Sequence, residues 1–165
     1  MANTHPRRGQ PYEMRKQLHK GEAAEAALDR HFADRFHVVA ATRKQQRQGI
    51  DRIFTQRASG QIYTMEYKTD WTAARTGNAF VETISVDREG IPGWVYTSHA
   101  EWLVYFVPAN FTIYLIAFAD LRARLPHWLA TYKPSPPIPN RGYNTHGILV
   151  PLAEFACIAS RIESA

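Results

Sequence analysis

An α/β fold, with a β-sheet laid against helices, is the fold class that this sequence of 165 residues predicts. Three observations indicate it. The chain opens with an amphipathic helical pattern over residues 13–36. Three short strand-like segments follow, each bounded by a polar or glycine-containing connection. Residues 101–118 then form an apolar hairpin pattern that is rich in aromatic and β-branched residues.

The first helical segment carries one acid on its core-facing side. On a wheel of about 100° per residue, six residues fall within one arc of roughly 80°: Leu18, Gly21, Glu25, Leu28, Phe32 and Phe36. Burying a lone carboxylate is unfavourable by several kcal/mol unless another group compensates for it. Glu25 is therefore expected to have a partner.

The next segments, 37–41, 50–55 and 62–68, are predicted strands of a β-meander that packs on this helix. Residues 43–49 and 69–79 are expected to be loops, and residues 80–86 alternate like a further strand.

In the second half, residues 90–93 predict a turn, and residues 94–99 favour no single structure. Residues 101–107 and 111–118 predict a buried hairpin, which serves either as core or as an interface between subunits. Residues 119–132 predict a helix that is bent or broken at Pro126. Residues 133–147, with four prolines, predict an extended surface segment, and residues 148–162 a short strand followed by a helix that starts near Pro151.

Length and composition predict a basic N-terminal arm at residues 1–12 and a single domain at residues 13–165. The sequence lacks an apolar stretch of the roughly 18 residues that a membrane span needs, and it lacks a secretory signal pattern. A cytoplasmic protein without a membrane partner is therefore expected. The one cysteine, Cys157, excludes an intramolecular disulfide and a multi-cysteine zinc site. Its apolar neighbours predict that it is buried.

The net charge of +5 belongs to the first third of the chain, where residues 1–60 hold twelve Lys or Arg against six Asp or Glu. An uneven excess of this kind favours a polyanionic partner such as DNA, because cations that neutralise phosphates release counterions. A solvated surface is the alternative interpretation.

The residues that carry chemistry lie on the second and third predicted strands. With a period of two, Glu66 and Lys68 project from one face of their strand. Asp51 opens the preceding strand, and antiparallel pairing through the short 57–60 turn is expected to set it near Glu66. The two carboxylates then share a cation.

This pattern is typical of phosphodiester hydrolysis. Bound Mg²⁺ can supply the nucleophilic water and neutralise charge, and it needs only one or two protein carboxylates. Mn²⁺ is a possible substitute. Lys68 is expected to orient the attacking water or to stabilise developing charge. Glu25 is expected to reach the metal directly or through water, which would offset its burial.

The order of an acid on a helix, a strand, a strand with Asp and a strand with Glu-x-Lys resembles the PD-(D/E)XK nuclease superfamily, which includes restriction endonucleases and Holliday-junction resolvases. The resemblance covers roughly residues 20–107. It is carried by Lys20-Gly21-Glu22-Ala23-Ala24-Glu25, by Gly49-Ile50-Asp51 and by Met65-Glu66-Tyr67-Lys68.

The resemblance implies a restriction-endonuclease-like core with a mixed central sheet flanked by helices, a metal-dependent endonuclease activity on DNA, and Mg²⁺ held by Asp51, Glu66, the carbonyl of Tyr67 and Glu25. Two departures stand out. Ile50 replaces the proline that usually precedes the first acid, and no clear long helix follows Lys68 directly.

Five polar residues are candidates for contact with DNA, since amide and cationic groups bind phosphates and base edges: Lys20, Arg43, Lys44, Gln45 and Arg47. A solvated loop explains most of them equally well. Glu82 is a further acid if its strand pairs beside Lys68, and His146 or Tyr143 is a weaker candidate for contact with substrate. The four tryptophans receive no role, because most are core or rim aromatics.

Two other functions remain open. One is a catalytically inactive DNA-binding or assembly module of the same fold, and the other is a metal-dependent hydrolase of RNA or nucleotides. The structure and sequence of the DNA that is cut are also open. Cleavage of both strands would favour a homodimer, since one active site cuts one strand.

Overall fold

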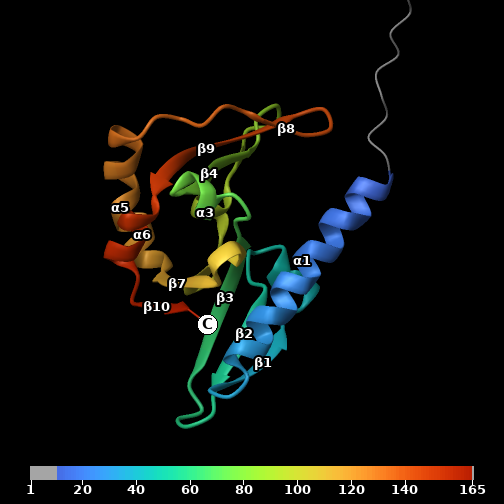
Figure 1. Ribbon diagram of the computed structural model, residues 1–165, viewed down its shortest axis with the longest axis vertical. Coiled ribbons are helices and arrows are strands. Elements are labelled where there is room, and N and C mark those ends of the chain that lie inside the picture. The colour runs from blue at the N-terminus through green and yellow to red at the C-terminus, as the bar shows by residue number, and fades with distance from the viewer. Residues whose placement is uncertain (1–10, 165) are drawn as a thin grey trace, which may run out of the picture.

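Six strands form a central sheet in the order β1-β2-β3-β6-β7-β10, and a second sheet has the order β5-β4-β9-β8. The structure, a computed structural model, describes residues 11–164, with side chains from residue 19 onward (Figure 1). The strands are β1 (Phe36–Ala40), β2 (Arg52–Gln56), β3 (Ile62–Thr69), β4 (Asn78–Val86), β5 (Ile91–Pro92), β6 (Trp102–Val107), β7 (Thr112–Ala117), β8 (Ile138–Pro139), β9 (Asn144–Pro151) and β10 (Arg161–Ser164). The helices are α1 (Pro11–Phe32), α2 (Arg43–Gln46), α3 (Ala73–Thr76), α4 (Trp94–Thr97), α5 (Phe118–Thr131), α6 (Leu152–Ile158) and the 3-10 turn η1 (Pro108–Asn110).

The central sheet is mixed, because β3 and β6 run parallel while the other neighbouring strands are antiparallel. A parallel pair needs a long crossover, and here residues 70–101 provide it with α3, β4, β5 and α4. The predicted meander is confirmed as β1-β2-β3, and the predicted hairpin as β6-η1-β7. The molecule is thus an α/β protein with a mixed central sheet flanked by helices.

Different elements cover the two faces of this sheet, as the alternation along β6 shows. Val104 and Phe106 pack with Leu28 of α1 on one face. Leu103 and Tyr105 belong to a larger core on the other face, built with α4, α5, α6 and the second sheet. Figure 1 shows α1 lying along β1, β2 and β3, with α5 and α6 at the far side of the molecule.

The first helix begins and ends earlier than predicted. It starts at Pro11, which suits a first turn because its missing N–H would have no helical partner there. The remaining residues of the predicted arm, 1–10, lie outside the described residues. Phe36 shares the helical arc in the sequence, but it opens β1 and packs on Phe32 and Phe54 from there.

Three predicted irregular regions contain short helices, so these predictions were incomplete. In the 43–49 segment, Thr42 and Gln45 form a capping box that starts α2. The 69–79 segment contains α3, and residues 94–97 form α4. The predicted break at Pro126 is wrong, because α5 runs from Phe118 to Thr131 without interruption.

The C-terminal region also differs from the prediction. Cys157 is exposed rather than buried. Helix α6 turns Phe155 into the core, and two residues further along a helix the side chain points roughly to the opposite side. After α6 the chain adds β10 to the edge of the central sheet beside β7, a strand that the sequence did not reveal.

The β6-β7 hairpin is core rather than interface. Both strands have a hydrogen-bonded neighbour on each side, and Leu103, Phe106 and Ile116 are almost fully buried. Among the described residues, no helix is both long and apolar enough to cross a membrane.

Candidate active site

Strand β3 sets an acid and a base side by side. Met65 and Tyr67 are buried in the core that lies under α1. Glu66 and Lys68, which alternate with them, project from the opposite face of the sheet. The Nζ atom of Lys68 lies 2.6 Å from Oε1 of Glu66. The prediction that these two side chains share one face is confirmed.

Asp51 is fixed to β3 by two hydrogen bonds. Its N–H donates to the carbonyl of Met65 at 2.8 Å, and its Oδ2 accepts the N–H of Tyr67 at 2.8 Å. The second bond ties the Asp51 carboxylate to the peptide group that links Glu66 and Tyr67. Antiparallel pairing through the 57–60 turn thus brings Asp51 beside Glu66, as the sequence predicts.

The carbonyl of Tyr67 lies on the same side of β3 as Asp51. Along a strand, the N–H and the carbonyl of one residue point to the same side, and residues two apart point the same way. The carbonyl of Met65 and the N–H of Tyr67 both bind Asp51, so the carbonyl of Tyr67 also points to that side. The pairing of β2 with β3 ends at Arg52 and Met65, one residue after Asp51. Three oxygen-bearing groups therefore converge at this end of β2: two carboxylates and one carbonyl.

Glu66 is buried, and one of its carboxylate oxygens has no partner. The residue is 3% exposed. Its Oε1 holds Lys68, but within the described part of the chain its Oε2 has no hydrogen-bond partner. The nearby hydroxyl of Ser98 donates to the carbonyl of Gly49 instead. A buried polar atom left in this state is unfavourable and calls for an explanation.

Gly49 packs closely against that oxygen and against Ser98. Its φ of +74° lies in the left-handed region, which residues with side chains rarely adopt. A Cβ atom at position 49 would lie 3.1 Å from Oε2 of Glu66 and 2.9 Å from the Cα of Ser98. The absence of a side chain at residue 49 is thus a steric requirement of the site.

The electrostatic environment of Glu66 is mixed. Burial raises the pKa of its carboxyl group above the ordinary value, Lys68 and the nearby hydroxyl of Ser98 lower it, and the neighbouring charge of Asp51 raises it further. The net direction is upward, because desolvation outweighs the contacts with Lys68 and Ser98. A cation between Asp51 and Glu66 would reverse that balance by stabilising both charged carboxylates.

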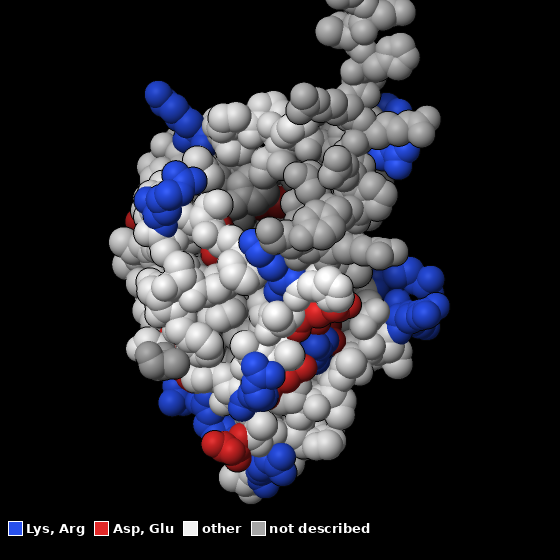
Figure 2. Space-filling view, turned by 45° about the vertical axis from the view of Figure 1, so that its right-hand side comes forward, with Lys and Arg blue, Asp and Glu red and all other residues white. Residues whose placement is uncertain are grey.

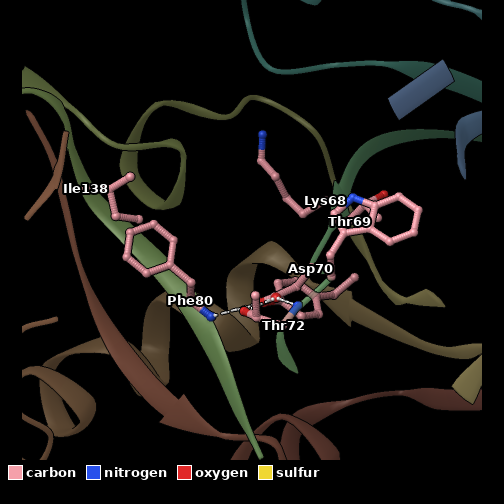
Figure 3. A pocket seen from close by; sticks show the side chains of 8 residues that line it. Lys68, Thr69, Asp70, Thr72, Phe80 and Ile138 are labelled. Carbon is pink, nitrogen blue, oxygen red and sulfur yellow. Dashed lines mark hydrogen bonds between the residues drawn. The ribbon is translucent and has the colours of Figure 1, made fainter. Parts of the chain in front are cut away.

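Lys68 belongs both to this site and to an adjoining cavity of about 290 Å³. In Figure 3, Lys68 and Thr69 lie on one side of the cavity and Phe80 and Ile138 on the other. The ammonium group also lies 5.8 Å from the centre of the Trp94 ring, a cation–π distance. The end of β3 therefore opens into a space bordered by aromatic side chains.

The opposite face of β2 and β3 carries a second charged cluster. The guanidinium of Arg52 donates to Glu25 at 2.8 Å and to Asp29 at 3.0 Å, and it lies over the ring of Tyr67. The hydroxyl of Tyr67 also donates to Asp29. Both acids belong to α1, so this cluster fastens the helix to the sheet.

Glu25 has a partner, Arg52, but its side chain is 44% exposed rather than buried as the helical wheel predicts. The structure does not bring Glu25 to Glu66, because α1 covers the face from which Met65 and Tyr67 project. The one link is indirect, since Arg52 also donates to the backbone carbonyl of Asp51 at 3.1 Å. A role of Glu25 at a metal stays a prediction.

The candidate DNA-contacting residues lie mainly on α2, which leads directly into Gly49. Arg43, Lys44 and Arg47 are exposed. The side-chain oxygen of Gln45 accepts hydrogen bonds from Thr42 as part of the capping box. On the face shown in Figure 2, the Lys and Arg side chains form several separate groups with acidic side chains among them, rather than one continuous patch.

Lys20, the remaining candidate, lies on α1. Its Nζ atom is 5.7 Å from the ring centre of Trp71. Since Trp71 also lines the cavity beside Lys68, this cation lies close to the candidate active site.

Of the three secondary candidates, Glu82 and His146 lie on the second sheet, and Tyr143 lies just before β9, where its carbonyl accepts the N–H of Asn140. The strand of Glu82 does not pair beside Lys68, because the neighbours of β3 are β2 and β6. Glu82 instead accepts the N–H of Trp94 at 3.3 Å. His146 lies 3.2 Å from Asp87, an acid whose pKa is lowered mainly by hydrogen bonds from Asn144.

Sequence reasoning missed the residues that shape the site from outside the motif. Arg52 follows Asp51 and Asp29 follows Leu28 in the chain. The sequence does not show that Arg52 and Asp29 pair with each other on the face that α1 covers. Ser98 lies 49 residues from Gly49, and no local pattern links the two.

The donor set fits a hard divalent cation. Among the described residues, no group of three or more His, Cys, Asp or Glu side chains could hold a metal. Mg²⁺ keeps several waters and takes one or two carboxylates, which Asp51 and Glu66 can provide together with the carbonyl of Tyr67. The unpartnered Oε2 of Glu66 is consistent with such an ion.

No family model, curated protein or solved structure matches this chain.

Proposed function

We propose that this protein is a Mg²⁺-dependent endonuclease that hydrolyses DNA phosphodiester bonds, with a restriction-endonuclease-like core of the PD-(D/E)XK type. The observation that carries the proposal is the buried Oε2 of Glu66, which has no hydrogen-bond partner among the described residues although the charge of Asp51 lies nearby. A buried carboxylate held by one ion pair is poorly compensated. A hard cation would supply the missing compensation.

In this proposal the carboxylates of Asp51 and Glu66 and the carbonyl of Tyr67 hold the ion. Bound Mg²⁺, or Mn²⁺ as a substitute, supplies charge neutralisation and an activated water. The hydrogen bond from the Tyr67 N–H orients Asp51, so that Oδ1 is the oxygen left for the ion. Such orientation by neighbouring groups is a common feature of metal sites.

Lys68 acts on the reacting groups. Its ion pair with Glu66 fixes the ammonium group at the end of β3, beside the carboxylates and at the edge of the open cavity. From there it orients the attacking water or stabilises the charge that develops on the phosphate oxygens.

Glu25, the auxiliary ligand that the sequence predicts, is bound to Arg52 on the α1 face, so this proposal does not need it to hold the ion. Lys20, Arg43, Lys44, Gln45 and Arg47 contact the DNA backbone, where cationic and amide groups bind phosphates. Because α2 runs directly into the Gly49–Asp51 segment, phosphate contacts on α2 would position the DNA strand against the acids.

The test is cleavage of labelled DNA in Mg²⁺ or Mn²⁺, with a chelator as the metal-free control. Lys68→Ala and Glu66→Gln are expected to lower the rate by about 10²–10³. Glu101→Gln is the matched control. Glu101 is an exposed acid that accepts hydrogen bonds from Thr64, a residue of β3 like Glu66 and Lys68. Its neutralisation is expected to leave the rate unchanged. Equal residual cleavage by the wild type and Lys68→Ala would remove the enzymatic proposal.

The same reagents separate the alternatives. An RNA or nucleotide hydrolase would cleave RNA or free nucleotides faster than DNA. An inactive module would bind DNA without cutting it, and calorimetric titration with Mg²⁺ would show no site that Asp51→Ala removes. Sedimentation with and without duplex DNA tests the proposed homodimer, which cleavage of both strands would favour.

A further inference from the structure

A small aromatic cavity adjoins the candidate active site. Its volume of about 290 Å³ is at the lower end of the roughly 300–1,000 Å³ that small-molecule pockets span. Trp71, Phe80 and Tyr105 supply three aromatic side chains to its lining, and Ile138 of β8 adds an aliphatic one. Lys68 links this cavity to the site on β3.

The lining residues differ in exposure in a way that leaves aromatic surface open to a ligand. Tyr105 is 2% exposed and closes the floor, whereas Trp71 is 50% and Ile138 43% exposed. Phe80 and Ile138 face Lys68 across the opening (Figure 3). An indole that is half exposed beside an open cavity offers a flat apolar face on which another flat group can stack.

Two cations belong to this part of the surface. Lys20 lies 5.7 Å from the centre of the Trp71 ring, and Lys68 lines the same cavity. An exposed aromatic side chain near cations suits a nucleobase whose neighbouring phosphates carry negative charge.

The acid in the cavity is already saturated with hydrogen bonds. The carboxylate of Asp70 accepts the hydroxyl of Tyr105 at 2.6 Å, the N–H of Thr72 at 2.8 Å and the N–H of Ala73 at 2.9 Å. Burial raises the pKa of Asp70, but these bonds outweigh it and lower the pKa overall. Asp70 therefore holds the loop after β3 in shape rather than reading the edge of a base.

From these observations we infer that the cavity takes an unpaired nucleobase of the DNA strand, stacked on Trp71, with little preference for base identity. The inference rests on the proposed nuclease function and names its substrate class. A base in a duplex is paired and stacked on both sides, so it must leave the helix to enter a pocket. Single strands, flaps and junctions present such bases already unpaired.

The test measures binding of a single-stranded oligodeoxynucleotide to the full-length protein in a chelator, where metal-dependent cleavage does not occur. A blunt duplex and a strand of abasic residues are the comparison ligands. The wild type is expected to bind the normal strand more tightly than either, since the abasic strand keeps the phosphates but has no base to stack.

Trp71→Ala is expected to weaken single-strand binding by roughly 5- to 100-fold, the effect of losing one stacked base. Trp71→Phe keeps an aromatic face and should recover most of the affinity. Tyr96→Ala is the matched control, since Tyr96 is 48% exposed and does not line the cavity. Quenching of tryptophan fluorescence adds a direct readout, because Trp71 is far more exposed than Trp94 or Trp128.

Unchanged affinity in Trp71→Ala, or equal binding of normal and abasic strands, overturns the inference. The comparison of normal and abasic strands uses only wild-type protein, so it tests the inference even if the Trp71→Ala variant folds poorly. The outcomes also separate this inference from the proposed function. A protein that cleaves DNA but ignores Trp71 contradicts only the stacking site, whereas one that stacks bases at Trp71 but never cleaves contradicts the nuclease.

Discussion

Both faces of the β2-β3 pair carry acidic and basic side chains, but the two groups differ in how fully their polar atoms are hydrogen-bonded. On the α1 face, Arg52 binds both Glu25 and Asp29, and Asp29 also accepts the hydroxyl of Tyr67. On the other face, Glu66 has one ion pair and one oxygen without a partner. The first cluster is complete, and the second is not.

This difference separates charges that stabilise the fold from charges that are free to act. A saturated network holds α1 to the sheet, and removing Arg52 leaves both acids without their cation. An unsaturated buried acid contributes little to stability and is a common feature of functional sites. The comparison therefore predicts that changes on the α1 face alter stability, and that changes on the Glu66 face alter activity.

The largest expected effect comes from replacing one aspartate on each face with its isosteric amide, asparagine. Asp51→Asn is expected to lower the kcat/KM of DNA cleavage by about 10²–10³, or roughly 2.7–4 kcal/mol of activation free energy. Asp29→Asn should lower it by less than about 10-fold and reduce the melting temperature instead. Equal losses of activity in the two variants would contradict the division between the faces.

Arg52→Leu is expected to lower the free energy of unfolding by about 2–3 kcal/mol, because it leaves two carboxylates of α1 without their cation. This value is below that of a fully buried pair, since the side chains of Glu25 and Asp29 are 44% and 34% exposed. Urea unfolding measures the change. Arg52→Lys, which keeps the charge but loses the forked contact, should fall between wild type and Arg52→Leu.

Gly49→Ala is expected to destabilise the protein by about 2–3 kcal/mol. Its φ of +74° and the contacts of the added Cβ with Ser98 and Glu66 both oppose the change. Gly60 has the same φ of +74° with nothing within 4 Å of the added atom. Gly60→Ala should therefore be unfavourable by about 1 kcal/mol, and thermal melts of both variants isolate the steric part. A Gly49→Ala protein as stable as Gly60→Ala would show that the site tolerates a side chain.

Glu66→Gln should stabilise the metal-free protein at pH 7, seen as a small rise in Tm, because the amide is uncharged and is buried at lower cost than the carboxylate. The pKa of Glu66 is raised above 4.5 in the folded state, mainly by burial. Between the unfolded-state pKa of about 4.5 and the higher pKa of the folded state, the folded protein holds more protons than the unfolded chain. Wild-type stability therefore falls as the pH rises through that window. Glu66→Gln has no such proton, and the gain should fade as the pH is lowered towards 4.5. A variant less stable than the wild type at every pH would contradict the account of Glu66.

Local patterns predicted much of the fold and part of the site. The period of two placed Glu66 and Lys68 on one face, and the short turn at 57–60 placed Asp51 on the neighbouring strand. These relations depend on strand geometry and on few intervening residues. The helical wheel also found that Glu25 needs a partner, but it extended the helix to Phe36, which the aromatic cluster with Phe54 holds in β1.

The sequence by itself determined the types of residue at the site, their shared face and the meander that carries them, because all three follow from contacts within about 20 residues. Only the tertiary structure decided which face α1 covers, and hence that Glu25 binds Arg52. It also decided that α4 brings Ser98 against Gly49, which leaves Oε2 of Glu66 without a partner. The physical reason is that burial and hydrogen-bond saturation depend on every element packed around an atom, and those elements lie far apart in the sequence.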